Sequence, residues 1–147
     1  AISFVNNHKD IKEVRRVIGP NKIIISKIET LNAIKDLKKI SEISNSLLID
    51  RGDLSRYVPI EKIPLAQEII IKKTKNLKKP VYVATNLLEN MIISSQPTRA
   101  ESNDIYSSLK QGARGLVLAA ETAIGKHPNS CVSFLKKCIS IYNSKKL

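Results

Sequence analysis

Short apolar runs alternate with longer amphipathic stretches along the chain. The runs are rich in β-branched residues and have the length of buried strands, roughly four to eight residues. They predict strands at residues 2–5, 22–29, 47–50, 80–85 and 115–119. The intervening stretches repeat apolar residues with a helical period. They predict helices at residues 8–18, 31–43, 60–77, 100–111 and 128–143, and a short helical piece at 86–91. Pro64 indicates a break or a late start in the third helix.

The predicted order is a strand followed by a helix, repeated along the chain, without any signal for an antiparallel hairpin. That order indicates an α/β fold with a parallel sheet and helical crossovers. No glycine-rich phosphate-binding pattern follows a strand, so neither a dinucleotide-binding fold nor a P-loop is indicated. We therefore expect about five βα units of a partial (β/α)8 TIM barrel, since a complete barrel needs about 250 residues.

Polar residues follow the predicted strands, where a barrel places its active site. Lys27 and Glu29 end the second strand and, being two residues apart, point to the same side. Asp53 follows the third strand, Thr85 ends the fourth, and Glu121 follows the fifth. The side chains at equivalent strand ends should therefore meet at one mouth.

These residue types suit a particular chemistry. Glu29 and Asp53 form a sparse set of oxygen ligands, which suits Mg²⁺ or Mn²⁺. Lys27 supplies a positive charge for a phosphoryl or enolate oxygen. Free N–H groups around Gly52 and Asp53, with the Thr85 hydroxyl, could hold a substrate carboxylate.

Plainer interpretations stand beside each of these assignments. The segment Leu47–Leu54 could be a surface turn with solvated charges, and Lys27 with Glu29 a simple salt bridge. Thr85 could cap a helix beginning near residue 86. For Glu121 we favour hydrogen bonds to neighbouring backbone. His8 and His127 are expected to be surface histidines without partners.

Composition narrows the class of partner. The net charge is +12, but the lysines follow helical patterns typical of solvated helix faces, and only 4% of residues are aromatic. We therefore expect no nucleic-acid partner, because base stacking needs aromatic side chains. A basic surface can still attract small phosphorylated anions. No apolar run approaches the roughly 20 residues that span a bilayer, and no signal peptide is visible. With two cysteines and no CxxC pattern, a cytoplasmic protein without membrane partners is expected.

The chain contains, in this order, the segments Ser26–Glu29, Arg51–Leu54, Ala84–Met91, Pro97–Glu101 with Asp104, and Glu121–Gly125. In order and in register, these segments resemble motifs of the pyruvate kinase family over nearly the whole chain.

The resemblance implies an enzyme that transfers a phosphoryl group from phosphoenolpyruvate to ADP, giving pyruvate and ATP. It assigns Lys27 to stabilising the transferring phosphoryl group and the enolate. It assigns Glu29 and Asp53 to the divalent metal, and the backbone at Gly52 and Asp53, with Thr85, to the substrate carboxylate. These roles agree with those reached from charge and position.

The match also has gaps. We expect residues 1–147 to be the C-terminal portion of the catalytic barrel, without the family's inserted β-domain and regulatory C-terminal domain. The arginine, asparagine, serine and aspartate that help to bind phosphate and K⁺ in the family belong to its first three strands, so K⁺ ligands are not expected in this chain. Ser55 and Arg56 also follow the Arg51–Leu54 motif where the family usually has a glycine.

Because part of the phosphate clamp is missing, we expect the isolated chain to be inactive or nearly so. A missing N-terminal half or a homo-oligomer would then complete it. Two alternatives stay open: a Mg²⁺-dependent lyase or aldolase acting on a 2-oxo acid, and a non-catalytic half-barrel that buries its strand edges against a partner.

Overall fold

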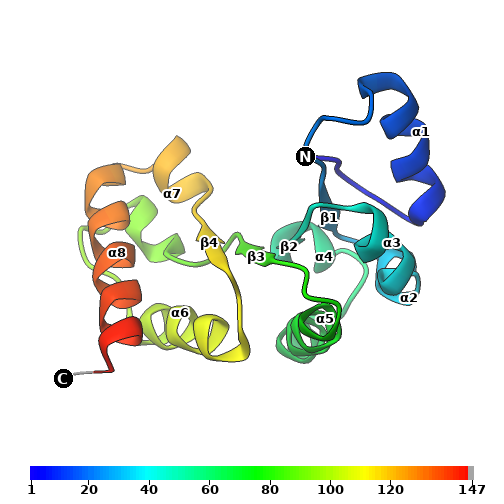
Figure 1. Cartoon of the computed structure of the whole chain (residues 1–147). Helices are drawn as coiled ribbons and strands as arrows, with labels where there is room; N and C mark the ends of the chain where they lie inside the picture. The colour runs from blue at the N-terminus through cyan, green and yellow to red at the C-terminus, as the bar shows by residue number, and fades with distance from the viewer. Residues whose placement is uncertain (146–147) are drawn as a thin grey trace.

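The computed structural model describes residues 1–145 as an α/β fold built on one parallel sheet (Figure 1). The strands are β1 (Ile25–Ile28), β2 (Ser46–Asp50), β3 (Val81–Ala84) and β4 (Gly115–Val117). They lie in the order β1-β2-β3-β4, so each strand pairs with the next one along the chain. This sequential order is that of a barrel wall, whereas a doubly wound sheet reverses its order at a switch point. The prediction of a partial TIM barrel is confirmed.

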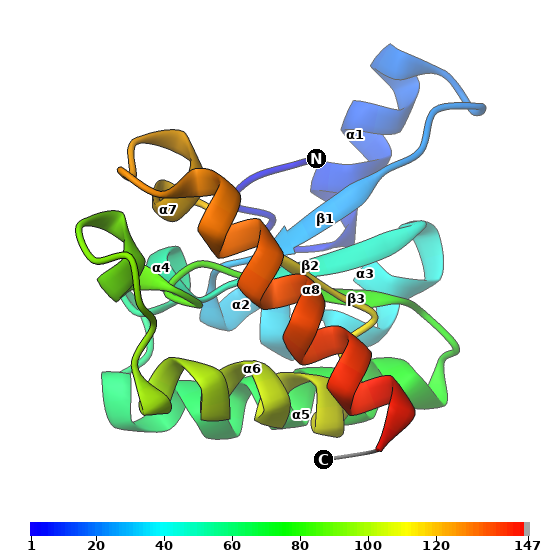
Figure 2. The same ribbon diagram turned by 90° about the vertical axis from the view of Figure 1, so that its left-hand side faces the viewer.

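Helices connect the strands and cover the sheet. The longer ones are α1 (His8–Ile18), α2 (Leu31–Lys35), α3 (Leu37–Ile43), α5 (Ile63–Asn76), α6 (Arg99–Gln111) and α8 (Pro128–Ser144). Single turns occur at α4 (Arg51–Leu54), α7 (Ala120–Ala123), and the 3-10 turns η1 (Ile60–Lys62) and η2 (Glu89–Ile92). Figure 2 shows α5 and α6 side by side along one side of the sheet.

The strand predicted at residues 2–5 is not formed. Only Ile2 pairs with the sheet, through a parallel bridge to Ser26. Its N–H donates to the Ile25 carbonyl at 2.8 Å, and its carbonyl accepts from the Lys27 N–H at 2.9 Å. Phe4 then adopts a left-handed conformation (φ 52°), which turns the chain away from the sheet. The start of this segment nevertheless lies beside β1, where the barrel order requires it.

Two helix predictions change in detail. The helix expected at residues 31–43 is interrupted at Asp36, whose carboxylate accepts hydrogen bonds from the His8 N–H at 2.8 Å and pairs with His8 Nδ1 at 2.7 Å. The expectation that His8 lacks a partner was therefore wrong. The helix expected at 60–77 begins at Ile63, which places Pro64 in its first turn. The late start that Pro64 indicated is confirmed.

The core consists of two clusters of apolar side chains. One packs around β1, β2 and β3, and β2 is buried along nearly its whole length, including Leu47 and Ile49. The absence of alternation in β2 fits a strand covered on both faces. The other cluster joins η2, α6 and α8 and includes the buried Cys131. Within residues 1–145, no helix is long and apolar enough to cross a membrane.

Candidate metal and substrate site

Three carboxylates gather at the C-terminal ends of β1 and β2. Glu29 directly follows β1, Asp50 is the last residue of β2, and Asp53 lies in the single turn α4. Each offers one oxygen, and these oxygens all lie within 4.8 Å of one another. The parallel pairing of Ile28 with Ile49 brings the two strand ends together. Asp50 was not among the predicted site residues, although it ends an apolar run.

Lys27 lies among these carboxylates. Its Nζ is 2.6 Å from Glu29 Oε1 and 3.0 Å from Asp50 Oδ2. Burial would lower the pKa of Lys27, but the hydrogen bonds and negative charges of Glu29 and Asp50 outweigh it, so its pKa is raised. Lys27 is therefore held as an ammonium group. The salt bridge of the plainer interpretation is present, and it is part of a larger acidic cluster.

Glu29 is fully buried, yet its two oxygens are treated differently. Oε2 accepts a hydrogen bond from the Phe4 N–H at 2.5 Å. Oε1 lies 2.6 Å from the Lys27 ammonium group, and no other donor among the described residues reaches it. A buried carboxylate needs a partner of opposite charge. This oxygen already faces one cationic group and is suited to a metal cation as well.

The N–H groups of the α4 turn are already used within the protein. Gly52 N–H donates to Thr85 Oγ1 at 2.9 Å, and Asp53 N–H donates weakly to Asp50 Oδ1 at 3.4 Å. The expectation that these N–H groups are free was therefore wrong for this structure. A Cβ at Gly52 would lie 3.5 Å from Thr85 Oγ1 and 3.6 Å from Asp50 Oδ1. A side chain there would thus stand over the two groups that the turn contacts.

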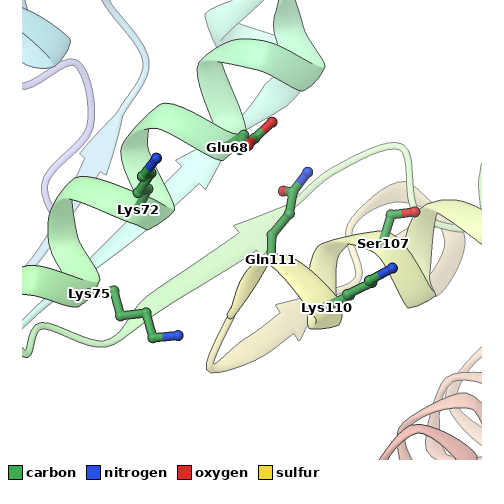
Figure 3. A pocket seen from close by; sticks show the side chains of 6 residues that line it. All are labelled: Glu68, Lys72, Lys75, Ser107, Lys110 and Gln111. Atoms are coloured by element: carbon green, nitrogen blue, oxygen red, sulfur yellow. The ribbon is translucent and has the colours of Figure 1, made fainter.

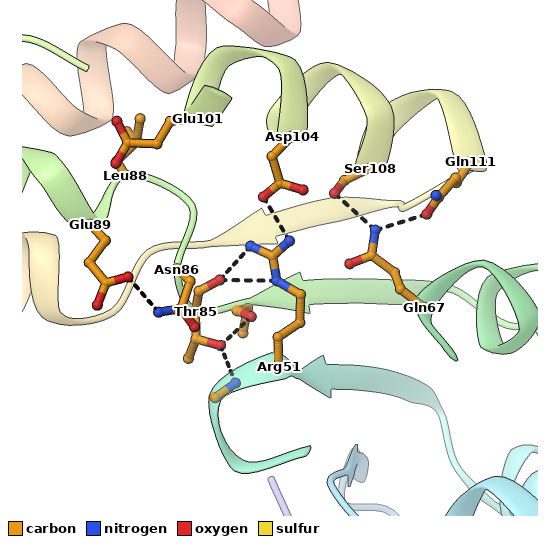
Figure 4. A network of polar contacts seen from close by, with 12 residues as sticks. Arg51, Gln67, Thr85, Asn86, Leu88, Glu89, Glu101, Asp104, Ser108 and Gln111 are labelled. Atoms are coloured by element: carbon orange, nitrogen blue, oxygen red, sulfur yellow. Dashed lines mark hydrogen bonds and ion pairs between the residues drawn. The ribbon is translucent and has the colours of Figure 1, made fainter. Parts of the chain in front are cut away.

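Thr85 is held in an unusual conformation by a buried arginine (Figure 4). Its φ is 69°, in the left-handed region that a β-branched residue rarely adopts. Arg51 donates to the Thr85 carbonyl from Nη2 at 2.6 Å and from Nε at 3.2 Å, and its Nη1 pairs with Asp104 of α6 at 2.7 Å. Thr85 does not cap a helix, because Leu88 is the residue preceding η2. The capping interpretation was wrong.

Glu121 is used structurally, as favoured. Its carboxylate accepts from the Leu88 N–H at 3.0 Å and from the Ala119 N–H at 2.7 Å. It thereby ties the start of α7 to the segment after β3. A cavity of about 200 Å³ opens beside Gly52 and Thr85 and extends to Ala119 and Ala120. The site therefore has both a charged corner and a small adjacent space.

The strands of this parallel sheet follow one another in sequence order, as in the wall of a TIM barrel. An acidic cluster and a lysine lie at their C-terminal ends, where a TIM barrel places its active site. The fold and the site together define a segment of a TIM barrel enzyme. The sequence model of the pyruvate kinase barrel domain matches residues 1–132. This chain belongs to the pyruvate kinase family.

Similar proteins of known name support the same family. A pyruvate kinase of Thermotoga maritima is 45% identical over 93% of this chain and 30% of its own length. A pyruvate kinase of Agrobacterium vitis is 38% identical over 95% of this chain and 29% of its own. The chloroplastic pyruvate kinase isozyme G of Ricinus communis is 42% identical over 90% of this chain and 32% of its own. The chain thus spans about a third of the length of these relatives. The family resemblance inferred from the motifs is confirmed.

Proposed function

We propose that this chain forms the C-terminal portion of a catalytic barrel that transfers a phosphoryl group from phosphoenolpyruvate to ADP, giving pyruvate and ATP. The observation that carries the proposal is the cluster of Lys27 with Glu29, Asp50 and Asp53 at adjacent strand ends, in a chain of the pyruvate kinase family. An acidic cluster alone could serve many reactions. With the family match it favours this one.

Glu29 and Asp53 would hold Mg²⁺ or Mn²⁺. The donor set is entirely oxygen, as these hard cations prefer, and Lys27 is the one partner of Glu29 Oε1 among the described residues. When bound, the cation would neutralise negative charge on substrate oxygens. Asp50 lies close enough to add a third carboxylate. Asp53 is paired with Arg56 at 3.3 Å, so that a bound cation would compete with this arginine.

Lys27 would stabilise the charge that moves during transfer. The bond from the phosphorus to the enol oxygen breaks, and a bond forms from the phosphorus to an oxygen of ADP. The electron pair left on the enol oxygen gives an enolate, which becomes pyruvate when its terminal carbon takes a proton. An ammonium group held close to both centres lowers the energy of this charge in the transition state. The raised pKa of Lys27 keeps it charged for that role.

The carboxylate of phosphoenolpyruvate would bind at α4. Here the N–H groups of Gly52 and Asp53 would leave Thr85 Oγ1 and Asp50 Oδ1 and donate to the substrate instead. The Thr85 hydroxyl donates to the Ala84 carbonyl at 2.6 Å and to Asp50 Oδ1 at 3.3 Å, so it would have to turn away from them to donate to the substrate as well. The hydrogen bond from the Asp53 N–H to Asp50 Oδ1 is long, at 3.4 Å, so little free energy is lost when the N–H donates to the substrate instead.

A coupled assay with phosphoenolpyruvate, ADP, Mg²⁺ and K⁺ tests the proposal. The chain is assayed alone and mixed with the preceding part of a relative's barrel, expressed separately. We expect little or no pyruvate from the chain alone and clear formation from the mixture. Lys27→Ala should lower the rate about 10²–10³-fold, and Asp53→Ala should also abolish most of it. Lys38→Ala, at an exposed position of α3, is the control and should leave the rate unchanged.

Other outcomes would favour other functions. Pyruvate formation that survives both Lys27→Ala and Asp53→Ala contradicts the site assignment. Cleavage of a 2-oxo acid without nucleotide would favour a lyase. A single defined oligomer without metal-dependent binding of phosphoenolpyruvate would favour a non-catalytic assembly module.

A further inference from the structure

A second polar cavity lies on the outside of the barrel wall, between α5 and α6 (Figure 3). Its volume is about 540 Å³, within the range of roughly 300–1,000 Å³ typical of small-molecule sites. It is lined by Glu68, Lys72, Lys75, Ser107, Lys110 and Gln111. This groove is named the α5/α6 groove below.

The α5/α6 groove carries unbalanced positive charge. Lys72 and Lys75 line it from α5 and Lys110 lines it from α6, against the single carboxylate of Glu68. Among residues 1–145, no carboxylate lies within ion-pair distance of any of these three ammonium groups. Like charges held near one another repel, and an anion that binds between them removes that repulsion.

The basic surface continues into a neighbouring cavity. This second space has a volume of about 330 Å³ and shares Lys75 with the α5/α6 groove. Lys78 and Arg114 also line it, and neither is ion-paired within the described residues. Lys79, by contrast, donates to the Ser44 carbonyl at 2.7 Å. Two adjoining spaces with a shared lysine suit an anion with more than one charged group.

Neutral side chains that line the α5/α6 groove can also donate hydrogen bonds to an anion. The buried Gln67 donates from Nε2 to Gln111 Oε1 at 2.8 Å and to Ser108 Oγ at 3.1 Å (Figure 4). Because the Gln111 oxygen is thus occupied, its amide nitrogen is the group left to donate into the groove. Ser107 adds a hydroxyl. The lining therefore offers ammonium, amide and hydroxyl donors together.

The location separates this groove from the proposed active site. The second cavity is lined by Pro80 and Val81 at the start of β3, and by Arg114 just before β4. These are the amino ends of the strands, whereas Glu29 and Asp53 lie beyond the carboxyl ends of β1 and β2. The cavity that shares Lys75 with the α5/α6 groove is thus at the opposite ends of the strands from the proposed active site.

We propose that the α5/α6 groove binds a small anion with two linked phosphate groups, at a site distinct from the proposed active site. Lysine is a common phosphate ligand, and the groove supplies several unpaired lysines in a space of ligand size. Neither cavity is lined by a phenylalanine, tyrosine or tryptophan. That argues against single-stranded nucleic acid, which stacks its bases on aromatic side chains.

Titration calorimetry with pyrophosphate as the probe tests the proposal, in metal-free buffer with the ionic strength held constant by NaCl. We expect saturable binding of one pyrophosphate per chain. The triple variant Lys72→Gln, Lys75→Gln, Lys110→Gln should raise the Kd at least about tenfold, which corresponds to about 1.4 kcal/mol. The control triple Lys12→Gln, Lys38→Gln, Lys136→Gln removes the same charge from exposed positions on α1, α3 and α8. It should change the Kd by less than about twofold, because distant surface charges are screened.

Circular dichroism checks that both triples are folded. If the groove triple does not fold, Lys72→Gln and Lys110→Gln are tested singly, with amide chemical shifts that locate the bound anion. The proposal is overturned by a lack of saturable binding, by an equal loss in the control triple, or by shifts centred on Lys27 and Glu29. Citrate that binds as tightly as pyrophosphate would overturn the phosphate class. A short single-stranded RNA that displaces pyrophosphate at a lower concentration would replace the small anion with a nucleic acid. None of these outcomes depends on catalysis, so the proposed function can fail or hold independently.

Discussion

Among the described residues, charged side chains are paired at the carboxyl ends of the strands and unpaired at the amino ends and in the α5/α6 groove. At the carboxyl ends, Lys27 is partly buried and contacts two carboxylates, and Arg51 is buried with each nitrogen of its guanidinium group donating a hydrogen bond. At the amino ends and along the α5/α6 groove, Lys72, Lys75 and Lys110 are exposed and have no described carboxylate within ion-pair distance. Paired charges fix a geometry, whereas unpaired charges attract a ligand. The comparison predicts that the same substitution will have very different effects at the two edges.

Arg51→Met should have the largest effect on stability. It leaves the Thr85 carbonyl and Asp104 without their partner. Loss of one member of a fully buried ion pair costs about 3–5 kcal/mol, but the Asp104 side chain is 34% exposed, so water can replace part of the lost interaction. We therefore expect the free energy of unfolding, measured in urea titrations, to fall by about 2–3 kcal/mol, at or below the lower end of that range. Lys75→Met, on the groove edge, should change it by no more than about 0.5 kcal/mol. Equal effects of the two substitutions would contradict the comparison.

Removal of the Arg56 side chain should moderately increase the affinity of the site for a divalent cation. Arg56 is exposed and pairs with Asp53 at 3.3 Å, so it competes with a cation for that carboxylate. An exposed ion pair contributes up to about 1 kcal/mol. Arg56→Gly should therefore tighten Mn²⁺ binding roughly twofold to fivefold, as measured by electron paramagnetic resonance of free Mn²⁺. Weaker binding in this variant would mean that Arg56 supports the site.

The alkaline stability of the chain should report the pairing of Lys27. Its pKa is raised, so its contribution to stability is fully present below the unfolded-state value of 10.5 and is lost as the pH rises through the higher folded-state value. The difference in the free energy of unfolding between the wild type and Lys27→Met should therefore be constant from pH 8 to 10 and shrink above pH 10.5. Urea titrations across this range measure it. A difference that disappears below pH 9 would contradict a protonated, paired Lys27.

Much of the edge that carries the acidic cluster could be predicted from local sequence. The β-branched runs located four strands of the sheet, and the period of two placed Lys27 and Glu29 on one side. The apolar run before Asp50 indicated a buried strand, which β2 is. These features depend on neighbouring residues alone.

The parts that the sequence did not predict depend on distant contacts or on single backbone angles. Arg51 contacts Asp104 across 53 positions, and His8 contacts Asp36 across 28, so nothing near either residue indicates its partner. Phe4 ends the expected first strand through one left-handed angle, although its apolar pattern is that of a strand. Gly52, Asp53 and Thr85 were predicted together to bind the substrate, but the hydrogen bond from the Gly52 N–H to Thr85 Oγ1 was not predicted.

The proposed function depends most on a divalent-cation site formed by Glu29 and Asp53. A Mn²⁺ titration of the chain, followed by electron paramagnetic resonance, measures it without any need for catalysis. One site is predicted, with the Kd raised at least about tenfold in Glu29→Gln and in Asp53→Asn. Glu68→Gln, which removes a carboxylate from the α5/α6 groove, should leave the Kd unchanged. An unchanged Kd for Mn²⁺ in Glu29→Gln and Asp53→Asn, or a loss of Mn²⁺ binding in Glu68→Gln, would contradict a cation site at Glu29 and Asp53.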